Sequence, residues 1–165
     1  VKNSGLAASV IRTPILLGPN TAGASSMIGA ATQAKTKILG GGKYSMRPLD
    51  IDDLNQAILN CCNGDSTEAK LYELVGPEPI SYHDLIQKTA AMMNNNVKIG
   101  SVPVAIAKLV AAISSRIKGG GITPTVIDVI TMDEVVDKNA DGELNITLTS
   151  LQNTLEKILE HKKNK

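Results

Sequence analysis

The sequence contains no Trp, no Phe and only three Tyr among its 165 residues. Proteins that bind single-stranded nucleic acid stack bases on aromatic side chains, and this sequence offers almost no such platform. No charge sign dominates either, because 17 Lys and Arg face 16 Asp and Glu for a formal net charge of +1. Without a basic stripe there is no electrostatic footprint for nucleic acid. We therefore expect no nucleic-acid partner.

Cysteine is also scarce, since Cys61 and Cys62 are the only two and they are adjacent. Neighbouring residues on a helix diverge by about a quarter turn, which suits neither a local disulfide nor a pair of metal ligands. Reduced thiols indicate a cytoplasmic protein.

No charged segment with a cleavage site opens the chain. The absence of an initiator Met predicts a processed product or an expressed fragment.

Apolar residues make up 42% of the sequence and charged residues 20%, which is the composition of a globular protein. The length predicts one unit covering residues 1–165 and a real core. With so few aromatics, that core must be built from Leu, Ile, Val, Ala and Met.

Extended and helical patterns alternate along the chain, which predicts an α/β fold with few short strands and several helices. Residues 15–24 carry turn chemistry and predict a loop. The predicted strands lie at residues 7–12, 44–49, 71–75 and 97–99. The predicted helices lie at residues 25–34 and 50–60, after Ser81, from residue 103, from residue 124 and after Thr149.

Three of these helices begin with capping side chains. Asp50 is placed to cap the helix at residues 50–60. Ser81 with Asp84 and Thr149 with Gln152 each have the spacing of a capping box. The sequence thus predicts where these helices begin.

The helix from residue 103 carries an apolar stripe at helical spacing. We interpret the stripe as packing against the protein's own core. Docking on a membrane surface is the alternative, but Lys108 and Arg116 alone make a thin basic face. The segment is also too short to span a bilayer, so we expect no membrane association. The stripe consists of Ile106, Leu109, Val110, Ile113 and Ile117.

Two motifs resemble ligand-binding sequences, but each is better explained without a ligand. The stretch GGGKYS lacks the third Gly of a dinucleotide fingerprint and precedes an extended segment, so it predicts a flexible loop. The stretch DKNADGELNITL places Asp137, Asn139 and Asp141 at the first, third and fifth positions of a calcium-binding loop. Its twelfth position, which should be Glu, is Leu148. We expect a turn that binds no calcium.

No catalytic residue can be assigned from the sequence. His83 falls in the first turn of a capped helix and His161 in the basic tail. Neither can be combined with a nucleophile, and no metal-ligand spacing is present.

Four segments in order resemble the C-terminal half of extended or atypical short-chain dehydrogenase/reductases. That family includes NAD-dependent epimerases and dehydratases and an accessory subunit of respiratory complex I. The segments are SGLAASVIRTPILLGP, GGGKYSMRPLDIDDLNQAI, KLYELVGPEPISYHDLI with SVPVAIAKLV, and LTSLQNTLEKILEH. The resemblance implies the substrate-side part of a Rossmann-like fold.

The resemblance also implies which residues face ligands. Thr13, Pro14, Ile15 and Leu17 match the strand edge that lies beside the cofactor in the family. Met46 and Arg47 match the position at which sugar-nucleotide members place a substrate-binding Arg. Ile15 and Leu17 are apolar where many sugar epimerases have Asn and Tyr, which weakens a nucleotide-sugar interpretation. Arg47 followed by Pro is closer to the complex I accessory branch.

The family's Gly-rich phosphate loop and its Tyr-x-x-x-Lys pair are not found in these 165 residues. We therefore expect NAD or NADP to bind a full-length parent and not this chain alone, and the chain alone to be inactive. A non-catalytic cofactor-binding protein of the same fold and an independent protein-binding module are the alternatives. The strand at 7–12 would leave an open edge, which predicts self-association.

Overall fold

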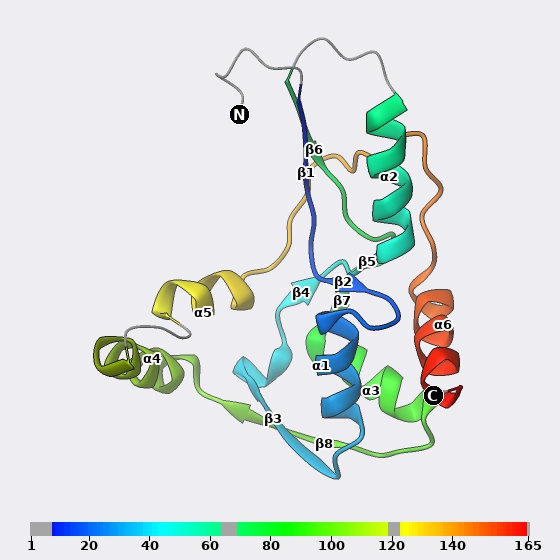
Figure 1. The fold of residues 1–165 in the computed structure, drawn as a ribbon. Helices are drawn as coiled ribbons and strands as arrows, with labels where there is room; N and C mark the ends of the chain where they lie inside the picture. Colours follow the sequence, from blue (N-terminus) through cyan, green and yellow to red (C-terminus); the bar gives the residue numbers. More distant parts are fainter. Residues whose placement is uncertain (1–7, 64–68, 119–122, 165) are drawn as a thin grey trace. The chain divides into compact units, whose positions relative to one another are not determined.

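The computed structural model shows helices and short strands, most of them paired in parallel (Figure 1), and the chain divides into two units. The structure describes residues 8–63, 69–118 and 123–164. Unit 1 comprises residues 1–26, 47–79 and 134–165, and unit 2 comprises residues 27–46 and 80–133. The α/β fold class predicted from the sequence is confirmed.

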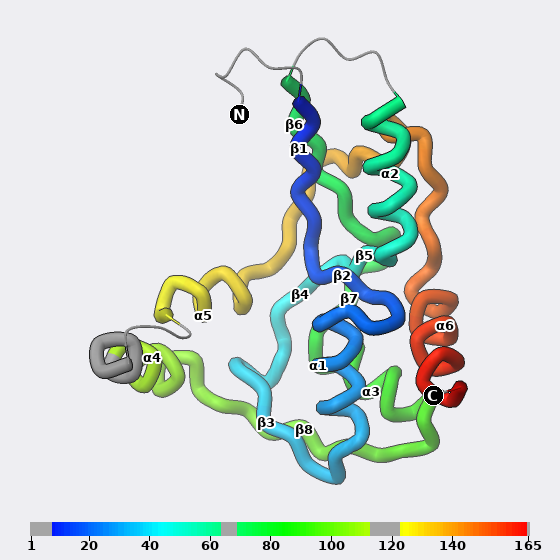
Figure 2. The backbone as a smooth tube through the Cα atoms, in the orientation of Figure 1, coloured from blue at the N-terminus to red at the C-terminus, as the bar shows by residue number. Residues whose placement is uncertain are grey.

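Unit 1 is built around two parallel strand pairs. Strand β1 runs beside β6, in register from Ser9 opposite Lys70 to Arg12 opposite Glu73 (Figure 2). Strands β2 and β5 pair from Leu16 opposite Leu49. The elements are β1 (Ser9–Arg12), β2 (Leu16–Leu17), β5 (Leu49–Asp50), α2 (Ile51–Asn63), β6 (Lys70–Glu73) and α6 (Leu151–Lys163).

The core of unit 1 contains the aliphatic side chains that the strands and α2 turn inward. Leu49, Ala57 and Leu74 have no exposed surface, and Ala140 and Leu144 pack with them from the later part of the chain. Each fully buried Leu stabilises the fold by roughly 1.5–3 kcal/mol relative to an exposed one.

Buried charge joins α6 to the start of α2. The carboxylate of Asp50 is almost fully buried and accepts hydrogen bonds from Thr154 Oγ1 at 2.7 Å and Lys157 Nζ at 2.6 Å. Lys157 also contacts Asp52 at 2.8 Å. A buried carboxylate is tolerated only when it is paired and hydrogen-bonded, so these contacts fix α6 against α2.

Unit 2 holds the other two strand pairs. Strands β3 and β8 are parallel over five residue pairs, and the shorter β4 and β7 are antiparallel. Ile38, Ile86 and Val97 lie in its core. The elements are β3 (Lys35–Leu39), a 3-10 turn (Gly40–Gly42), β4 (Ser45–Met46), β7 (Ile80–Ser81), α3 (Tyr82–Met92), β8 (Lys98–Val102), α4 (Val104–Lys118) and α5 (Pro124–Thr131).

Helix α1 (Ala22–Ala31) begins in unit 1 and continues in unit 2, and it starts three residues before the predicted helix at 25–34. Thr21 caps it, because its Oγ1 accepts from the Ala24 N–H at 3.2 Å. The predicted loop at 15–24 therefore contains β2 and a helix start.

Helix α6 begins one residue later than the predicted capping box implies. Ser150 is its N-cap and accepts from the Asn153 N–H at 3.3 Å. Thr149 instead donates its hydroxyl to Asp53 Oδ1 at 2.7 Å, and its N–H donates to Asp53 Oδ2 at 2.8 Å. The prediction that Thr149 caps α6 was wrong because a distant carboxylate binds it.

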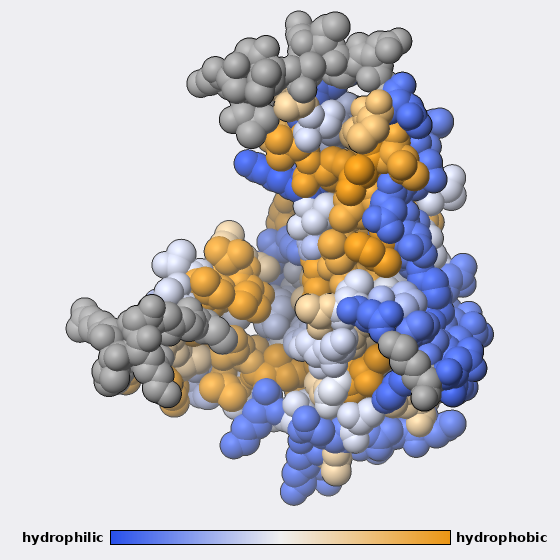
Figure 3. Space-filling model, viewed as in Figure 1, coloured by the Kyte–Doolittle hydropathy of each residue, from blue (hydrophilic) through white to orange (hydrophobic). Residues whose placement is uncertain are grey.

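The apolar stripe of α4 is not in the core over the part whose side chains are described. Ile106, Leu109 and Val110 are 56%, 63% and 60% exposed, so the core-packing interpretation was wrong for them. The helices α4 and α5 pack on each other, and Ala111 of α4 and Ile127 of α5 are buried. Apolar side chains are exposed over α5 (Figure 3). Ile113 and Ile117 lie where side chains are not described.

Candidate functional site

The candidate site lies at the carboxyl ends of β1 and β6, which meet because the two strands are parallel. Arg12 and Glu73 end the register, and Arg12 Nη1 lies 3.3 Å from Glu73 Oε1. The ladder continues one step further, where the Leu74 N–H donates to the Arg12 carbonyl at 2.9 Å. Pro14 has no N–H to offer a ladder, so the chain leaves β1 here.

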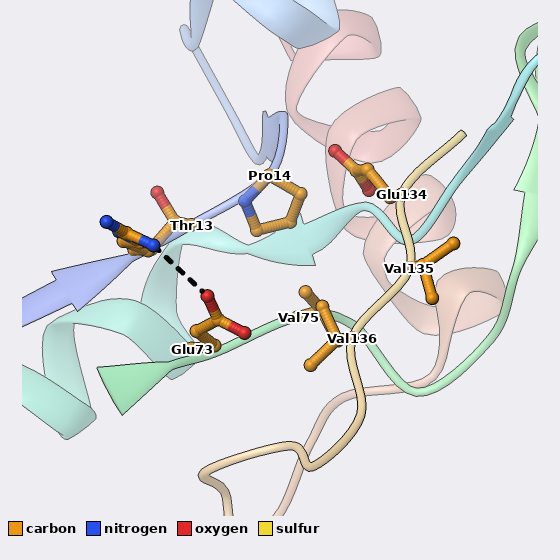
Figure 4. A pocket seen from close by; sticks show the side chains of 8 residues that line it. Thr13, Pro14, Glu73, Val75, Glu134, Val135 and Val136 are labelled. Carbon is orange, nitrogen blue, oxygen red and sulfur yellow. Dashed lines mark hydrogen bonds and ion pairs between the residues drawn. The ribbon is translucent and has the colours of Figure 1, made fainter. Parts of the chain in front are cut away.

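A cavity of about 150 Å³ opens where the chain leaves the strand (Figure 4). Thr13 and Pro14 line one side, and a segment from the later part of unit 1 lines another. Ligand pockets commonly occupy about 300–1,000 Å³, so this cavity would hold only part of a dinucleotide-sized ligand. Its lining consists of Arg12, Thr13, Pro14, Glu73, Val75, Glu134, Val135 and Val136.

The lining combines an apolar floor with three charged side chains. Arg12 and Glu73 are 67% and 45% exposed at the side chain, so their ion pair contributes at most about 1 kcal/mol. Glu134 Oε2 accepts from the Arg47 N–H at 2.7 Å, which fixes this carboxylate at the rim. The site has the polar groups to orient a small ligand group and the apolar surface to pack against it.

The structure brings two of the four predicted cofactor contacts to this cavity. Thr13 and Pro14 line it. Ile15 is half-buried, and its carbonyl accepts from the Leu49 N–H at 3.1 Å. Leu17 has no exposed surface, so its side chain offers nothing to a ligand in this conformation.

The two predicted substrate contacts fall in different units. Met46 is 8% exposed on β4 in unit 2, opposite Ile80 of β7. In unit 1, Arg47 donates from Nε to the Gly76 carbonyl at 3.0 Å and from Nη2 to the Pro77 carbonyl at 2.9 Å. These bonds use two of the five guanidinium N–H donors.

Glu134, Val135 and Val136 were missed by the sequence reasoning. They lie in a stretch without helical or strand periodicity, and their contact with the strand ends is long-range. Arg12 and Glu73 also line the cavity and were missed, although opposite charges at the end of one predicted strand and within another were a possible signal.

A second polar cluster, at the start of α3, has the residue types of a hydrolytic triad but not its geometry. Asp84 accepts from Ser81 Oγ at 2.8 Å and contacts His83 Nδ1 at 3.0 Å. The hydrogen bonds from His83 and then Ser81, more than the nearby imidazole charge, lower the pKa of Asp84. The carboxylate stands between the hydroxyl and the imidazole, so the cluster is a helix cap. In the part of the chain that the structure describes, no group of three His, Cys, Asp or Glu residues could hold a metal ion.

The topology and the position of the cavity define an α/β fold of the Rossmann-like type, in which ligands bind at the carboxyl ends of parallel strands. No protein-family model matches the sequence, and no curated protein matches it. Solved structures do match. The chain is similar to a UDP-N-acetylglucosamine 4-epimerase from Methanobrevibacter ruminantium, at a TM-score of 0.66 and 10% identity, covering 98% of this chain and 48% of that one.

Two further solved structures show the same likeness. One is the ADP-L-glycero-D-manno-heptose-6-epimerase of Helicobacter pylori, with TM-score 0.63, 13% identity, and coverage of 93% of this chain and 43% of that one. The other is MoeE5, solved with UDP-glucose and NAD, with TM-score 0.64, 13% identity, and coverage of 94% and 47%. The chain thus shares its fold with part of each of these structures and spans about half of their length.

Among the described residues, none of the helices is both long enough and apolar enough to cross a membrane.

Proposed function

We propose that this chain is the C-terminal, substrate-side portion of an NAD(P)-dependent oxidoreductase or epimerase/dehydratase, and that Thr13 and Pro14 form one wall of its cofactor site. The observation that carries this proposal is the cavity at the carboxyl ends of β1 and β6. In open α/β sheets, ligands bind at this end of the strands. The likeness to MoeE5, which holds NAD, supports the choice of cofactor.

Thr13 and Pro14 would offer a hydroxyl, a carbonyl and a rigid apolar ring to the nicotinamide end of the cofactor. Ile15 and Leu17 would shape that wall from behind, since their side chains are half-buried and buried. Arg47 would use its remaining N–H donors for an anionic substrate group, with Met46 beside it in sequence.

The chain alone would bind NAD or NADP negligibly and would not catalyse. The pyrophosphate of a dinucleotide is held by a Gly-rich βαβ unit, and the 165 residues contain no such motif. One or two hydrogen bonds at about 1 kcal/mol each do not offset the several kcal/mol lost when a dinucleotide is immobilised.

Thermal unfolding with each dinucleotide tests this proposal. A longer polypeptide in which a Gly-rich βαβ unit precedes residue 1 should be stabilised by NAD or NADP, by about 2.7 kcal/mol at a hundred times the dissociation constant. Pro14→Phe or Ile15→Trp in the longer polypeptide should weaken binding, whereas Val126→Phe on the exposed face of α5 should not. Equal stabilisation of the short chain would show that the assignment of a split cofactor site is wrong.

A non-catalytic protein of the same fold, with the cofactor as a structural element, is the second candidate. The Arg47-Pro48 pair favours it, because it is closer to the complex I accessory branch. The apolar Ile15 and Leu17 weaken a nucleotide-sugar interpretation. The coding sequence upstream of residue 1 separates the two candidates. A Gly-rich unit with Tyr-x-x-x-Lys supports an enzyme, and a Gly-rich unit without that pair supports the non-catalytic protein.

An independent protein-binding module is the third candidate, favoured by the exposed apolar faces of α4 and α5. The absence of any coding sequence upstream would support it over the other two.

The free thiols of Cys61 and Cys62 agree with our proposal that the protein is cytoplasmic.

We also propose that the chain self-associates through β1. This strand pairs with β6 and with no other strand among the described residues. Open strand edges template pairing with further chains. Sedimentation should therefore show dimers or larger species, and a strictly monomeric chain would contradict the proposal.

A further inference from the structure

The β3–β8 ribbon of unit 2 presents three lysines on its outer face. Side chains two residues apart on a strand point the same way, so Lys35 and Lys37 share a face. The register sets Lys98 directly opposite Lys35. All three lysines are exposed, while Ile38 and Ile99 on the other face belong to or pack against the core of unit 2.

This arrangement is unfavourable when nothing covers it. Like charges held side by side on neighbouring strands repel one another. None of the three ammonium groups has an ion pair or hydrogen bond among the described residues. Lys37 lies opposite Gly100, and a Cβ added at Gly100 would meet the Lys37 stem at 3.6 Å. The glycine leaves the space beside Lys37 open.

The wider charge distribution points the same way. Unit 2 contains eight Lys and Arg and three Asp, a formal charge of +5, although the whole chain carries only +1. Neither strand of the ribbon contains an acidic residue. The outer face is thus the basic surface of a basic unit, and its complement is negatively charged.

The free edge of β3 identifies the kind of partner. Among the described residues, β3 pairs only with β8, so its other edge has no strand beside it. Only another extended polypeptide can satisfy the backbone groups of a strand edge by a ladder. We propose that an acidic, extended polypeptide segment adds to the β3 edge and places its carboxylates beside Lys35 and Lys37.

The spacing of the lysines fits such a segment. Alternate residues on a strand lie about 6.6 Å apart, so a segment with a carboxylate at every second position matches the two lysines. Nucleic acid would lack aromatic stacking partners on this face, because neither strand carries an aromatic residue. A lipid surface would gain only about 1 kcal/mol per lysine and could not pair with the strand edge.

Fluorescence anisotropy with a labelled ten-residue peptide of alternating Glu and Thr tests the proposal. The peptide should bind the full chain, and its counterpart of alternating Gln and Thr should bind at least about fivefold more weakly. Amide hydrogen exchange should slow at alternate residues of β3 when the Glu peptide is added, which charge attraction alone would not produce.

Matched variants locate the site. Lys35→Gln with Lys37→Gln should weaken Glu-peptide binding at least about fivefold, because two exposed ion pairs are lost. Lys43→Gln with Lys88→Gln makes the same charge change elsewhere in unit 2 and should alter binding less than twofold. Unchanged melting temperatures would show that both variants fold.

Three results would overturn the proposal. The first is equal binding of the Glu and Gln peptides, or no binding of either. The second is unchanged exchange at β3 with the peptide bound. The third is tighter binding of an oligothymidine of similar length, or of phosphatidylserine vesicles, that is lost in the Lys35/Lys37 variant. That result would assign the face to nucleic acid or to lipid.

Discussion

Asn139 forms a two-way hydrogen-bonded pair with the backbone of Val75. Its Oδ1 accepts from the Val75 N–H at 3.0 Å, and its Nδ2 donates to the Val75 carbonyl at 2.9 Å. The adjacent Ala140 N–H donates to the Glu73 carbonyl at 3.0 Å. The side-chain amide thus takes the place of a neighbouring strand where β6 ends and the candidate site begins.

Replacing Asn139 by Ala should destabilise the protein by about 1–3 kcal/mol, because the N–H of the buried Val75 would lose its partner. Urea unfolding measures the difference. Asp137→Ala, at an exposed position two residues earlier, should change the free energy of unfolding by less than about 0.5 kcal/mol. Equal effects of the two substitutions would contradict the role of the amide.

Calcium should not bind at residues 137–148. The oxygen of Asn139 that a calcium loop would use already accepts from the Val75 N–H. Leu148 stands where a bidentate Glu is needed, and its side chain packs against the core of unit 1. Calorimetric titration should give no saturable heat, whereas a dissociation constant near micromolar would overturn this prediction.

Thr149 and Asp53 should be energetically coupled. The neighbouring Ser150 should show no such coupling to Asp53. Thr149→Ala should lose about 1–2 kcal/mol, because its hydroxyl no longer donates to the Asp53 carboxylate, while the bond from the backbone N–H remains. In an Asp53→Asn background that loss should shrink. Ser150→Ala should lose about 1 kcal/mol in either background, as the loss of an N-cap. A double-mutant cycle measures the coupling, and an additive result for Thr149 and Asp53 would refute it.

Alkaline pH should weaken the contact between α6 and α2. Burial of the Lys157 ammonium opposes its charge, but the hydrogen bonds to Asp50 and Asp52 prevail and raise the pKa of Lys157. A group whose pKa is raised on folding stabilises the protein below its unfolded pKa, about 10.4 for Lys, and that contribution is lost as pH rises through the folded value.

Urea unfolding across pH 9 to 12 measures this loss against Lys157→Arg, which stays protonated. Tyr44 also makes stability depend on pH in this range, because desolvation and then the nearby Tyr82 raise its pKa to about 12. The comparison should therefore be made in a Tyr44→Phe background. An equally steep decline with Arg at position 157 would contradict the prediction.

Local patterns were enough to predict several elements. The apolar runs at residues 7–12 and 71–75 became β1 and β6, and the capped helix after Ser81 became α3. Strand β3 was not predicted, because it alternates Lys with Thr and Ile on one short segment and its pairing with β8 is long-range. The spacing of the apolar residues in α4 predicts a helix, but it does not predict whether another element covers that apolar face.

The candidate site was predictable only where it follows a strand. Thr13 and Pro14 were expected there because their segment resembles the family's strand edge beside the cofactor, and both line the cavity after β1 ends. Glu134 and Val136 come from a stretch with no period, and their position depends on contacts such as that between Glu134 and the Arg47 backbone. The burial of Leu17 was also invisible, since β2 is two residues long.

The interleaving of the two units constrains how this chain can be made. Unit 1 is assembled from three separate stretches of sequence, and unit 2 is inserted between them. Asp50 receives its bonds from Thr154 and Lys157, which are 104 and 107 residues further along the chain. During synthesis, the Asp50 carboxylate therefore has no partner until α6 has left the ribosome. Unit 1 cannot close before the segment that follows unit 2 in the sequence has been made.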